Sequence, residues 1–479
     1  MIMTKMIMER VPSAILFIVV ILISACNKPA PMPKPISLNP ENPHYFSYNG
    51  KPAVLITSGE HYGAVMNPDF DYKTYLKTLQ KDGLNLTRTM TGGYFEPAGA
   101  FNISKNTMGP VRQKFLCPWK RIGTELKFDL NQWDEAYFVR LKDFMATAQQ
   151  SEVVVELALF CPFYEEMQWE LSPFNIKNNV NSLGDIPRTD VYTLDKNSGL
   201  LAVQEKMVRK LVDELKDFPN LIYEICNEPY FGGITLEWQE YISKVISDAE
   251  KEFPHKHLIS QNIANGSQLI ENPNPLVSVF NFHYAAPPVA VTQNFHLNKV
   301  IGENETGFKG QKDSTYRKEA WELILAGGGL YNNLDYSFTT EHPTGTFQYP
   351  ANQPGGGSVA LRRQLSYLKQ FIESMDFVAL KPDITACTGG IPEGQKSYLL
   401  SEPGKQYAFY LMGGGQVRPE FYLQAGNYHV EWLNPVSGVK TTAPEIVHSG
   451  GRITLQSPAF VEDIALKISK KREIGGHKL

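Results

Sequence analysis

The sequence predicts an α/β protein, a (β/α)8 TIM barrel followed by a small antiparallel β-sandwich domain. Between residues 52 and 376, eight short apolar runs alternate with longer amphipathic segments, which is the pattern of repeated strand–helix units. After Phe377 the chain changes to short alternating runs separated by Gly, Pro and Asn, which is typical of antiparallel strands. We therefore expect a barrel domain at residues 44–377 and a sandwich domain at residues 378–470.

The runs predicted as barrel strands are nearly continuous in apolar residues, as expected for parallel strands that are covered on both faces. They are Ala53–Thr57, Leu84–Thr89, Val153–Phe160, Leu221–Cys226, His257–Ile263, Leu276–Phe282, Lys299–Asn304 and Gly329–Asp335. A doubly wound sheet is the alternative fold, and it would need a glycine-rich phosphate loop after its first strand. Residues 58–63 read Ser-Gly-Glu-His-Tyr-Gly, which is not such a loop.

Apolar residues at spacings of three and four predict helices between these strands. The second helical pattern follows Asn131, which we expect to be its N-cap, and a last helix behind Ser358 should close the barrel. The helical patterns begin near Tyr72, Trp133, Leu201, Trp238, Tyr316 and Leu361. The strands predicted for the sandwich are Ser397–Ser401, Gln406–Met412, Glu420–Gln424, Tyr428–Leu433, Ile453–Gln456 and Asp463–Ile468.

Composition narrows the class of protein. The 479-residue chain is 42% hydrophobic and 20% charged, a balance that excludes a mostly disordered or fibrous protein. Its net charge of −4 provides no basic footprint for nucleic acid. Four cysteines follow the N-terminal region, at positions 117, 161, 226 and 387, and their spacing matches no zinc site. We expect free thiols rather than a disulfide, and neither a metal nor another cofactor.

The N-terminus resembles a targeting segment. An uncharged run from Val11 to Ala25 follows two basic residues and is shorter than the ~20 residues that a membrane-spanning helix needs. Residues 23–26 read Ile-Ser-Ala-Cys and resemble a bacterial lipobox, which implies a signal peptide at residues 1–25 and a lipid on Cys26. A plain signal peptide with a coincidental cysteine is the alternative.

The residues after Cys26 extend this interpretation. Asn27 resembles the residue found in lipoproteins that are sent to the bacterial outer membrane, where they face the periplasm or the cell surface. Six prolines from Pro29 to Pro43 exclude a helix there and predict a semi-rigid tether over residues 26–43.

Polar residues follow several of the predicted strands, at the end of a TIM barrel where active sites lie. Glu228 ends the fourth strand and Glu305 ends the seventh, so the two carboxylates should face each other across the barrel mouth. Such a pair is what cleavage of a glycosidic bond needs: one acid protonates the leaving oxygen, and the other attacks the anomeric carbon or activates water. Other polar residues at strand ends are Arg88, His283, Tyr284 and Asp335.

Two short motifs carry a resemblance to a known group. Asn227-Glu228-Pro229 and Glu305-Thr306-Gly307 resemble the clan A glycoside hydrolases, of which family 5 is the best-known member. The resemblance covers residues 40–376 and implies retaining cleavage of β-type bonds, with Glu228 as general acid/base and Glu305 as nucleophile. Glu228 would then begin protonated, with its pKa raised in part by the charge of Glu305.

The same resemblance gives roles to the neighbours of the acid pair. Asn227 would bind the sugar 2-hydroxyl, Arg88 and Tyr284 would hold Glu305 ionised, and His283 would line the same wall. A core position for His283, and a structural acid as the partner of Arg88, are the alternatives.

Two further glutamates compete for the catalytic roles. Glu303 has the same strand parity as Glu305, so alternation does not separate the two, and only the motif favours Glu305. Glu224, four residues before Glu228, should lie deeper in the barrel as a hydrogen-bonded structural carboxylate.

The chain also departs from family 5. No histidine follows the third strand and no tryptophan stands at the eighth, where the sequence reads Leu334-Asp335-Tyr336. The order of lipoprotein signal, barrel and sandwich resembles bacterial apiosidase-like barrels, whose C-terminal domain type is named for collagen binding and is similar to residues 432–438. We expect this domain to pack on the barrel.

Long loops at residues 89–131 and 162–198 bring aromatic residues over the predicted barrel mouth and favour a pocket. Trp119, His61 and Asp335 are candidate substrate contacts. We expect a carbohydrate partner, no nucleic acid, membrane contact only through the lipid anchor, and a monomer. Clustered strand-end histidines for a metal hydrolase and a G-x-S-x-G elbow are both missing. The alternative function is a non-catalytic glycan-binding surface lipoprotein on the same scaffold.

Overall fold

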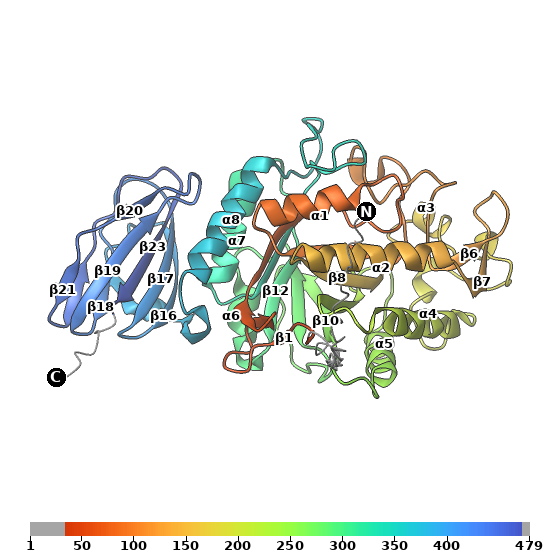
Figure 1. Ribbon diagram of the computed structural model, residues 1–479, viewed down its shortest axis with the longest axis horizontal. Coiled ribbons are helices and arrows are strands. Elements are labelled where there is room, and N and C mark those ends of the chain that lie inside the picture. Colours follow the sequence, from red (N-terminus) through yellow and green to blue (C-terminus); the bar gives the residue numbers. More distant parts are fainter. Residues whose placement is uncertain (1–33, 472–479) are drawn as a thin grey trace, which may run out of the picture. The chain divides into compact units, whose positions relative to one another are not determined.

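The computed structural model describes residues 34–471 (Figure 1). The predicted signal peptide, residues 1–25, and the lipid-attachment residue Cys26 lie outside the described residues and stay predictions. Among the described helices, none combines the length and the apolar character needed to cross a membrane.

Eight parallel strands form the barrel and confirm the predicted fold class. Their order around the sheet is β4-β13-β12-β11-β10-β9-β8-β5. The bounds are β4 Leu55–Gly59, β5 Leu86–Met90, β8 Val154–Phe160, β9 Leu221–Cys226, β10 Leu258–Asn265, β11 Val279–His283, β12 Val300–Glu305 and β13 Leu330–Leu334. Each strand lies on one of the eight predicted runs, within a few residues at either end.

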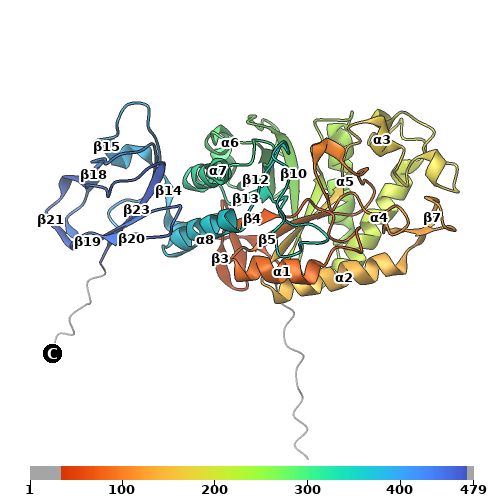
Figure 2. The same cartoon turned by 90° about the horizontal axis from the view of Figure 1, so that it is seen from above.

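Helices surround this barrel on its outer side (Figures 1 and 2). Their apolar stripes are buried against the strands, as the spacing of three and four residues predicted. The bounds are α1 Tyr72–Lys81, α2 Glu135–Gln150, α3 Glu166–Trp169, α4 Leu200–Leu215, α5 Leu236–Ala249, α6 Val289–Asn294, α7 Asp313–Leu325 and α8 Val359–Glu373. The short helices α3 and α6 were not predicted from the sequence.

A side chain completes the barrel between its first and second strands. The Ile56 backbone N–H donates to Asn85 Oδ1 (2.9 Å), and Asn85 Nδ2 donates to the Val54 carbonyl (2.9 Å). The Asn85 N–H also donates to the Ile56 carbonyl (3.3 Å). Because Asn85 comes directly before β5, its amide satisfies backbone groups of β4 where no strand ladder does.

The polypeptide before the barrel is packed rather than separate. The strands β1 Ser37–Leu38, β2 Phe46–Tyr48 and β3 Lys51–Ala53 form a small sheet. Ile36 is fully buried beside the first residues of the barrel strands, and its N–H donates to the Pro219 carbonyl (2.8 Å). The segment predicted as a tether over residues 26–43 therefore joins the folded body from Ile36 onward, because Ile36 covers the apolar base of the barrel.

The start of α2 also differs from the prediction. Asp134, not Asn131, is the N-cap, and its side chain accepts a hydrogen bond from the Ala136 N–H (2.9 Å). Asn131 instead belongs to the hairpin formed by β6 Trp119–Arg121 and β7 Phe128–Trp133, which lies within the long loop after β5.

The C-terminal domain consists of two antiparallel sheets. The larger runs β14-β16-β17-β23-β19-β20, with β21 also paired to β19, and the smaller runs β15-β18-β22. All six predicted sandwich strands are present, and four short ones were not predicted. The bounds are β14 Lys381–Pro382, β15 Cys387–Gly389, β16 Lys396–Glu402, β17 Gln406–Met412, β18 Glu420–Leu423, β19 Gly426–Leu433, β20 Lys440–Thr442, β21 Ile446–His448, β22 Gly451–Thr454 and β23 Asp463–Lys470.

One face of the larger sheet packs on α7 and is held there by a buried ion pair. Arg317 of α7 donates two hydrogen bonds of 2.9 Å to the carboxylate of Asp463 on β23. Tyr410 of β17 donates to the same carboxylate (2.9 Å) and stacks on Trp321, with ring centroids 5.1 Å apart. Because both ends of the pair are buried, each charge depends on the other for compensation.

We predict that Arg317→Met destabilises the protein by about 3–5 kcal/mol, because it leaves the charge of Asp463 buried without its partner. Urea unfolding followed by tryptophan fluorescence measures the change. Lys244→Met, which removes an exposed ion pair to Asp248, serves as the control and should leave the midpoint unchanged. Equal midpoints for both variants would contradict this account of the contact between barrel and sandwich.

Candidate active site

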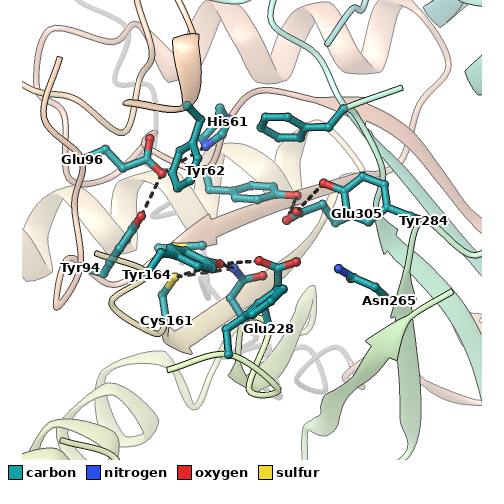
Figure 3. A pocket seen from close by; sticks show the side chains of 15 residues that line it. His61, Tyr62, Tyr94, Glu96, Cys161, Tyr164, Glu228, Asn265, Tyr284 and Glu305 are labelled. Atoms are coloured by element: carbon teal, nitrogen blue, oxygen red, sulfur yellow. Dashed lines mark hydrogen bonds and ion pairs between the residues drawn. The ribbon is translucent and has the colours of Figure 1, made fainter. Parts of the chain in front are cut away.

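A cavity of about 340 Å³ opens at the carboxyl ends of the barrel strands (Figure 3). Its lining includes three carboxylates, Glu96, Glu228 and Glu305, and the neutral polar residues Asn227 and Asn265. Aromatic side chains supply much of the remaining wall: Tyr62, Tyr94, Phe101, Tyr164, Phe231, Tyr284 and Phe308. The volume lies within the ~300–1,000 Å³ range of small-molecule sites.

Glu228 and Glu305 meet in this cavity, as the sequence predicted. Glu305 is the last residue of β12, while Glu228 follows β9 in a turn with φ of +36°. Such a backbone conformation is sparsely populated by residues other than glycine and aims the Glu228 side chain across the barrel mouth. One oxygen of each carboxylate and Nδ1 of His283 all lie within 4.8 Å of one another.

A buried arginine connects the two strands that carry these acids. Arg88 Nε donates to Glu224 (2.6 Å), Nη1 donates to Glu305 (3.0 Å), and Nη2 donates to Asn227 Oδ1 (2.7 Å). Burial alone would lower the pKa of Arg88, but the charges of Glu224, Tyr62 and Glu305 and the hydrogen bond to Glu224 together outweigh it and hold that pKa well above its usual value. The sequence left open whether Arg88 pairs with Glu305 or with a structural acid. It pairs with both, Glu305 and the deeper Glu224.

Two tyrosines donate hydrogen bonds to Glu305. Tyr62 Oη lies 3.1 Å from Oε2, and Tyr284 Oη lies 3.3 Å from Oε1. Tyr284 was predicted as a neighbour of Glu305, but Tyr62 was missed, since it follows β4 in a loop without a motif. With Arg88, these donors fix the orientation of the Glu305 carboxylate.

Glu228 is held by another set of donors. Tyr164 Oη donates to Oε2 (2.6 Å), Tyr230 Oη donates to Oε1 (3.3 Å), and His283 Nδ1 lies 3.2 Å from Oε1. Asn227 Nδ2 in turn donates to Tyr164 Oη (2.8 Å). Neither Tyr164 nor Tyr230 was predicted, although Tyr164 lies in the long loop after the third strand.

The protonation of the unliganded site differs from the prediction. Burial raises the pKa of Glu228, but the hydrogen bond and the charge of His283 outweigh it, so the pKa of Glu228 is lowered. For His283, burial lowers the pKa and the charges of Glu305 and Glu228 outweigh it, so the pKa is raised. The proton expected on Glu228 is therefore held by the Glu228–His283 pair, on the imidazole side, because His283 lies between the two carboxylates.

Glu303 and Glu305 are separated by a bulge in the barrel. Phe282 of β11 pairs with Glu303, whereas the next residue, His283, pairs with Glu305. Glu303 is completely buried, accepts a hydrogen bond from the Ala285 N–H (2.7 Å), and does not line the cavity. Burial, reinforced by the charge of Glu319, raises the pKa of Glu303 well above its usual value, which favours a neutral carboxyl group.

The remaining predicted contacts divide into two groups. His61 lines the cavity, with Nε2 3.6 Å from Glu96 Oε1. Trp119 and Asp335 do not line it, which differs from the prediction. Trp119 is fully buried against Phe174. Asp335 is also fully buried, and its carboxylate accepts hydrogen bonds from Arg362 (2.7 Å) and Ser58 (2.9 Å).

A metal ion would have to share the residues of the acid pair. Among the described residues, the group of His, Cys, Asp and Glu side chains placed closely enough to hold one ion is Glu228, His283 and Glu305. Arg88 already brings a positive charge to within 3.0 Å of Glu305, so the site has a cation of its own. The four described cysteines are free thiols, as the sequence predicted.

Comparison with solved structures finds this fold in glycoside hydrolases. A protein described as a glycoside hydrolase aligns with a TM-score of 0.61 at 12% identity, over 92% of this chain and 98% of its own. A family 5 glycoside hydrolase from Bacteroides vulgatus ATCC 8482 gives 0.61 at 12% identity, over 91% and 93%. A family 5 mannosidase from Rhizomucor miehei gives 0.50 at 14% identity, over 72% and 100%. These likenesses show a shared fold.

No protein-family profile and no curated protein matches the sequence. The comparison of structures therefore shows the fold, and the chemistry of the site follows from its residues.

We predict that Glu228→Gln lowers the pKa of His283, because the variant removes one of the two negative charges that raise it while burial remains. The expected fall is about 1 unit or more for a charge at this distance. Titration of the histidine C–H signals by NMR measures it. Glu237→Gln, on the exposed side of α5, is the control. An unchanged His283 titration in Glu228→Gln would show that the two groups do not share a proton.

Proposed function

We propose that the protein is a retaining glycoside hydrolase that cleaves β-type O-glycosidic bonds of a poly- or oligosaccharide. The observation that carries the proposal is the separation of Glu228 and Glu305, whose oxygens approach within 4.8 Å. Retaining glycosidases hold their two carboxyl groups ~5–5.5 Å apart, whereas inverting ones leave ~6.5–9.5 Å for a water molecule. The approach of one oxygen of each carboxylate to within 4.8 Å is closer to the retaining spacing and supports retention.

In the first half of the proposed reaction, Glu305 is the nucleophile. One of its carboxylate oxygens bonds to the anomeric carbon while the bond from that carbon to the leaving oxygen breaks. Arg88, Tyr62 and Tyr284 hold Glu305 oriented for this attack. Glu228 transfers a proton to the leaving oxygen, so that an alcohol departs.

In the second half, Glu228 acts as the base. It takes a proton from water, the water oxygen bonds to the anomeric carbon, and the bond to Glu305 breaks. The two inversions at the anomeric carbon return its original configuration. Tyr164 and Tyr230 hold the Glu228 carboxylate in position in both halves of the cycle.

In this proposal, His283 holds the proton that Glu228 transfers to the leaving oxygen. The Glu228–His283 pair enters the cycle with one proton, and substrate that covers the cavity removes water from Glu228, which favours the neutral carboxylic acid over its ion. His283 then remains as the neutral partner of Glu228 until the base step returns the proton.

A non-catalytic glycan-binding protein is the second function considered. A binding site has no need for two carboxylates that are held by five donors, Arg88, Tyr62, Tyr284, Tyr164 and Tyr230. The two functions differ in a single measurement, because only the enzyme releases a sugar with time.

We predict that Glu305→Gln abolishes release of sugars from a panel of plant and host glycans that the wild type cleaves. Glu228→Gln should lower the rate about 10²–10⁴-fold with alcohol leaving groups and far less with 4-nitrophenol, which departs without a proton. Product anomers followed by NMR in the first minutes should keep the configuration of the substrate.

Glu303→Gln is the matched control for these variants. It changes a carboxyl group on the same strand that lies outside the cavity and that burial already favours in its neutral form, so activity should stay near that of the wild type. Equal activity of Glu305→Gln and the wild type would refute the assignment of the nucleophile. Tight glycan binding by a wild type that releases no sugar would favour the binding protein.

We predict that His283→Asn moves the alkaline limb of the kcat/KM profile to lower pH. In the wild type, the proton needed for the first step is held by a pair in which the pKa of His283 is raised above 6.5, so activity persists above that pH. In the variant, Glu228 alone must hold that proton, and it loses the proton at a lower pH than the Glu228–His283 pair of the wild type does. An unmoved alkaline limb would contradict the role given to His283.

A further inference from the structure

The positions of Glu228 and Glu305 define how a substrate lies in the cavity. This argument rests on the proposed function: the leaving group must lie beside Glu228, which protonates it, and the sugar that is attacked must extend past Glu305. Tyr164, Tyr230 and Asn265 surround the side of Glu228, where Tyr230 Oη also donates to Asn265 Oδ1 (2.6 Å). The residues beyond Glu305 therefore contact the sugar at the non-reducing side of the bond.

The wall beyond Glu305 carries a polar pair, His61 and Glu96 (Figure 3). His61 lies next to Tyr62, the donor to Glu305, with ring centroids 5.6 Å apart. Both members of the pair line the cavity although they are only 8% and 4% exposed, and Nδ1 of His61 has no hydrogen-bond partner within residues 34–471. A buried ring nitrogen without a partner, at a cavity wall, points to a ligand group that supplies one.

Glu96 is held so that its carboxylate stays at this wall. Tyr94 Oη donates to Oε1 (3.1 Å), and Asn106 Nδ2 donates to Oε2. The acid pair does not use these residues. A carboxylate beside an imidazole is suited to sugar hydroxyl groups, since the carboxylate accepts hydrogen bonds and the ring can donate or accept.

Two long loops meet beside this pair. The first, residues 91–118 after β5, meets the second, residues 335–358 between β13 and α8. Asn102 Nδ2 donates to the Asn352 carbonyl (3.0 Å), the Ser104 N–H donates to Gln353 Oε1 (2.9 Å), and Lys105 pairs with Glu341. We call these three contacts the loop seam. The seam thus joins the loop that carries Glu96 to the loop whose Tyr336 packs on His61, with ring centroids 5.4 Å apart.

The charges in the cavity define which sugar fits. Three carboxylates line it, and the buried cation nearest to Glu305, Arg88, is already engaged by Glu224, Glu305 and Asn227. A sugar with a carboxylate of its own would meet the charge of these carboxylates, while Arg88 is engaged and His61, with Nε2 3.6 Å from Glu96 Oε1, is already paired with an acid. A neutral sugar with free hydroxyl groups meets no such cost.

We propose that the protein is exo-acting and removes a single neutral sugar from a non-reducing end. The pair His61 and Glu96 binds the hydroxyl groups remote from the anomeric carbon, and the loop seam excludes any further residue on that side. The proposal thus assigns specificity to residues outside the acid pair.

The test compares two kinds of 4-nitrophenyl β-glycoside. One set carries a single unmodified glucose, galactose, mannose or xylose, and the other set carries short oligosaccharides of these sugars whose terminal hydroxyl groups are blocked by an acetal. We expect cleavage of at least one single-sugar substrate and no cleavage of any blocked one. Cleavage of blocked substrates at comparable rates would overturn the exo proposal and leave the glycosidase intact. If the wild type cleaves neither set nor the glycan panel, both proposals fail.

Variants test the two parts of the proposal separately. Glu96→Gln and His61→Asn should each lower kcat/KM about 10–100-fold on the single-sugar substrate, and should lose most of the wild-type preference for it over analogues that lack one remote hydroxyl group. A merely structural effect would lower kcat/KM equally for the single-sugar substrate and for its analogues. That result would overturn the role of the pair. Glu125→Gln, in an exposed turn, is the control.

The loop seam is tested by opening it. The double variant Lys105→Ala with Gln353→Ala removes the ion pair and one hydrogen bond of the seam without touching the cavity lining. We expect it to gain cleavage of the blocked substrates at least tenfold over the wild type. A fully folded double variant that remains inactive on them would show that something other than the seam closes this side.

Discussion

The buried guanidinium of Arg88 is the interaction on which the site depends. It reaches from β5 to Glu224 inside the barrel, to Glu305 at the end of β12, and to Asn227 after β9. A buried charge without a partner is costly, and the guanidinium lies within hydrogen-bond distance of both carboxylates. Since Arg88 is itself 1% exposed, the compensation is mutual, and each of the three charges holds the others in place.

Below Arg88 the barrel interior is polar, and its carboxylates are hydrogen-bonded to asparagines. Glu224 accepts hydrogen bonds from Asn262 (3.0 Å) and Asn304 (3.1 Å), and Asn304 also donates to Glu156 (3.1 Å). Burial, followed by the charge of Glu224, raises the pKa of Glu156 to about 7, so the interior can lower its own negative charge by taking up a proton. This layer fixes the lower side of the acid pair by hydrogen bonds rather than by apolar packing alone.

The sequence pattern was sufficient for the barrel because each strand is a short buried run that alternates with an amphipathic helix, and the acid pair followed from strand ends and two short motifs. It was not sufficient where local geometry breaks periodicity. The bulge between β11 and β12 is invisible in a pattern of alternation, so Glu303 and Glu305 were equivalent until the structure separated them. Trp119 was placed in a loop, but a hairpin there turns it into the core. Tyr62 and Tyr164 lie in loops, where composition does not reveal direction.

The departures from the family 5 pattern fall on the walls of the cavity and not on the acid pair. After the third strand, where a histidine was missing, Tyr164 contacts Glu228 and Asn227. After the eighth, where a tryptophan was missing, Tyr336 packs against His61 with ring centroids 5.4 Å apart, buried behind the polar pair. Where a flat ring would stack on a sugar, this chain has an imidazole and a carboxylate at the cavity wall. Hydrogen-bonding walls discriminate between sugars more sharply than stacking surfaces do, because an unmatched polar group is left buried.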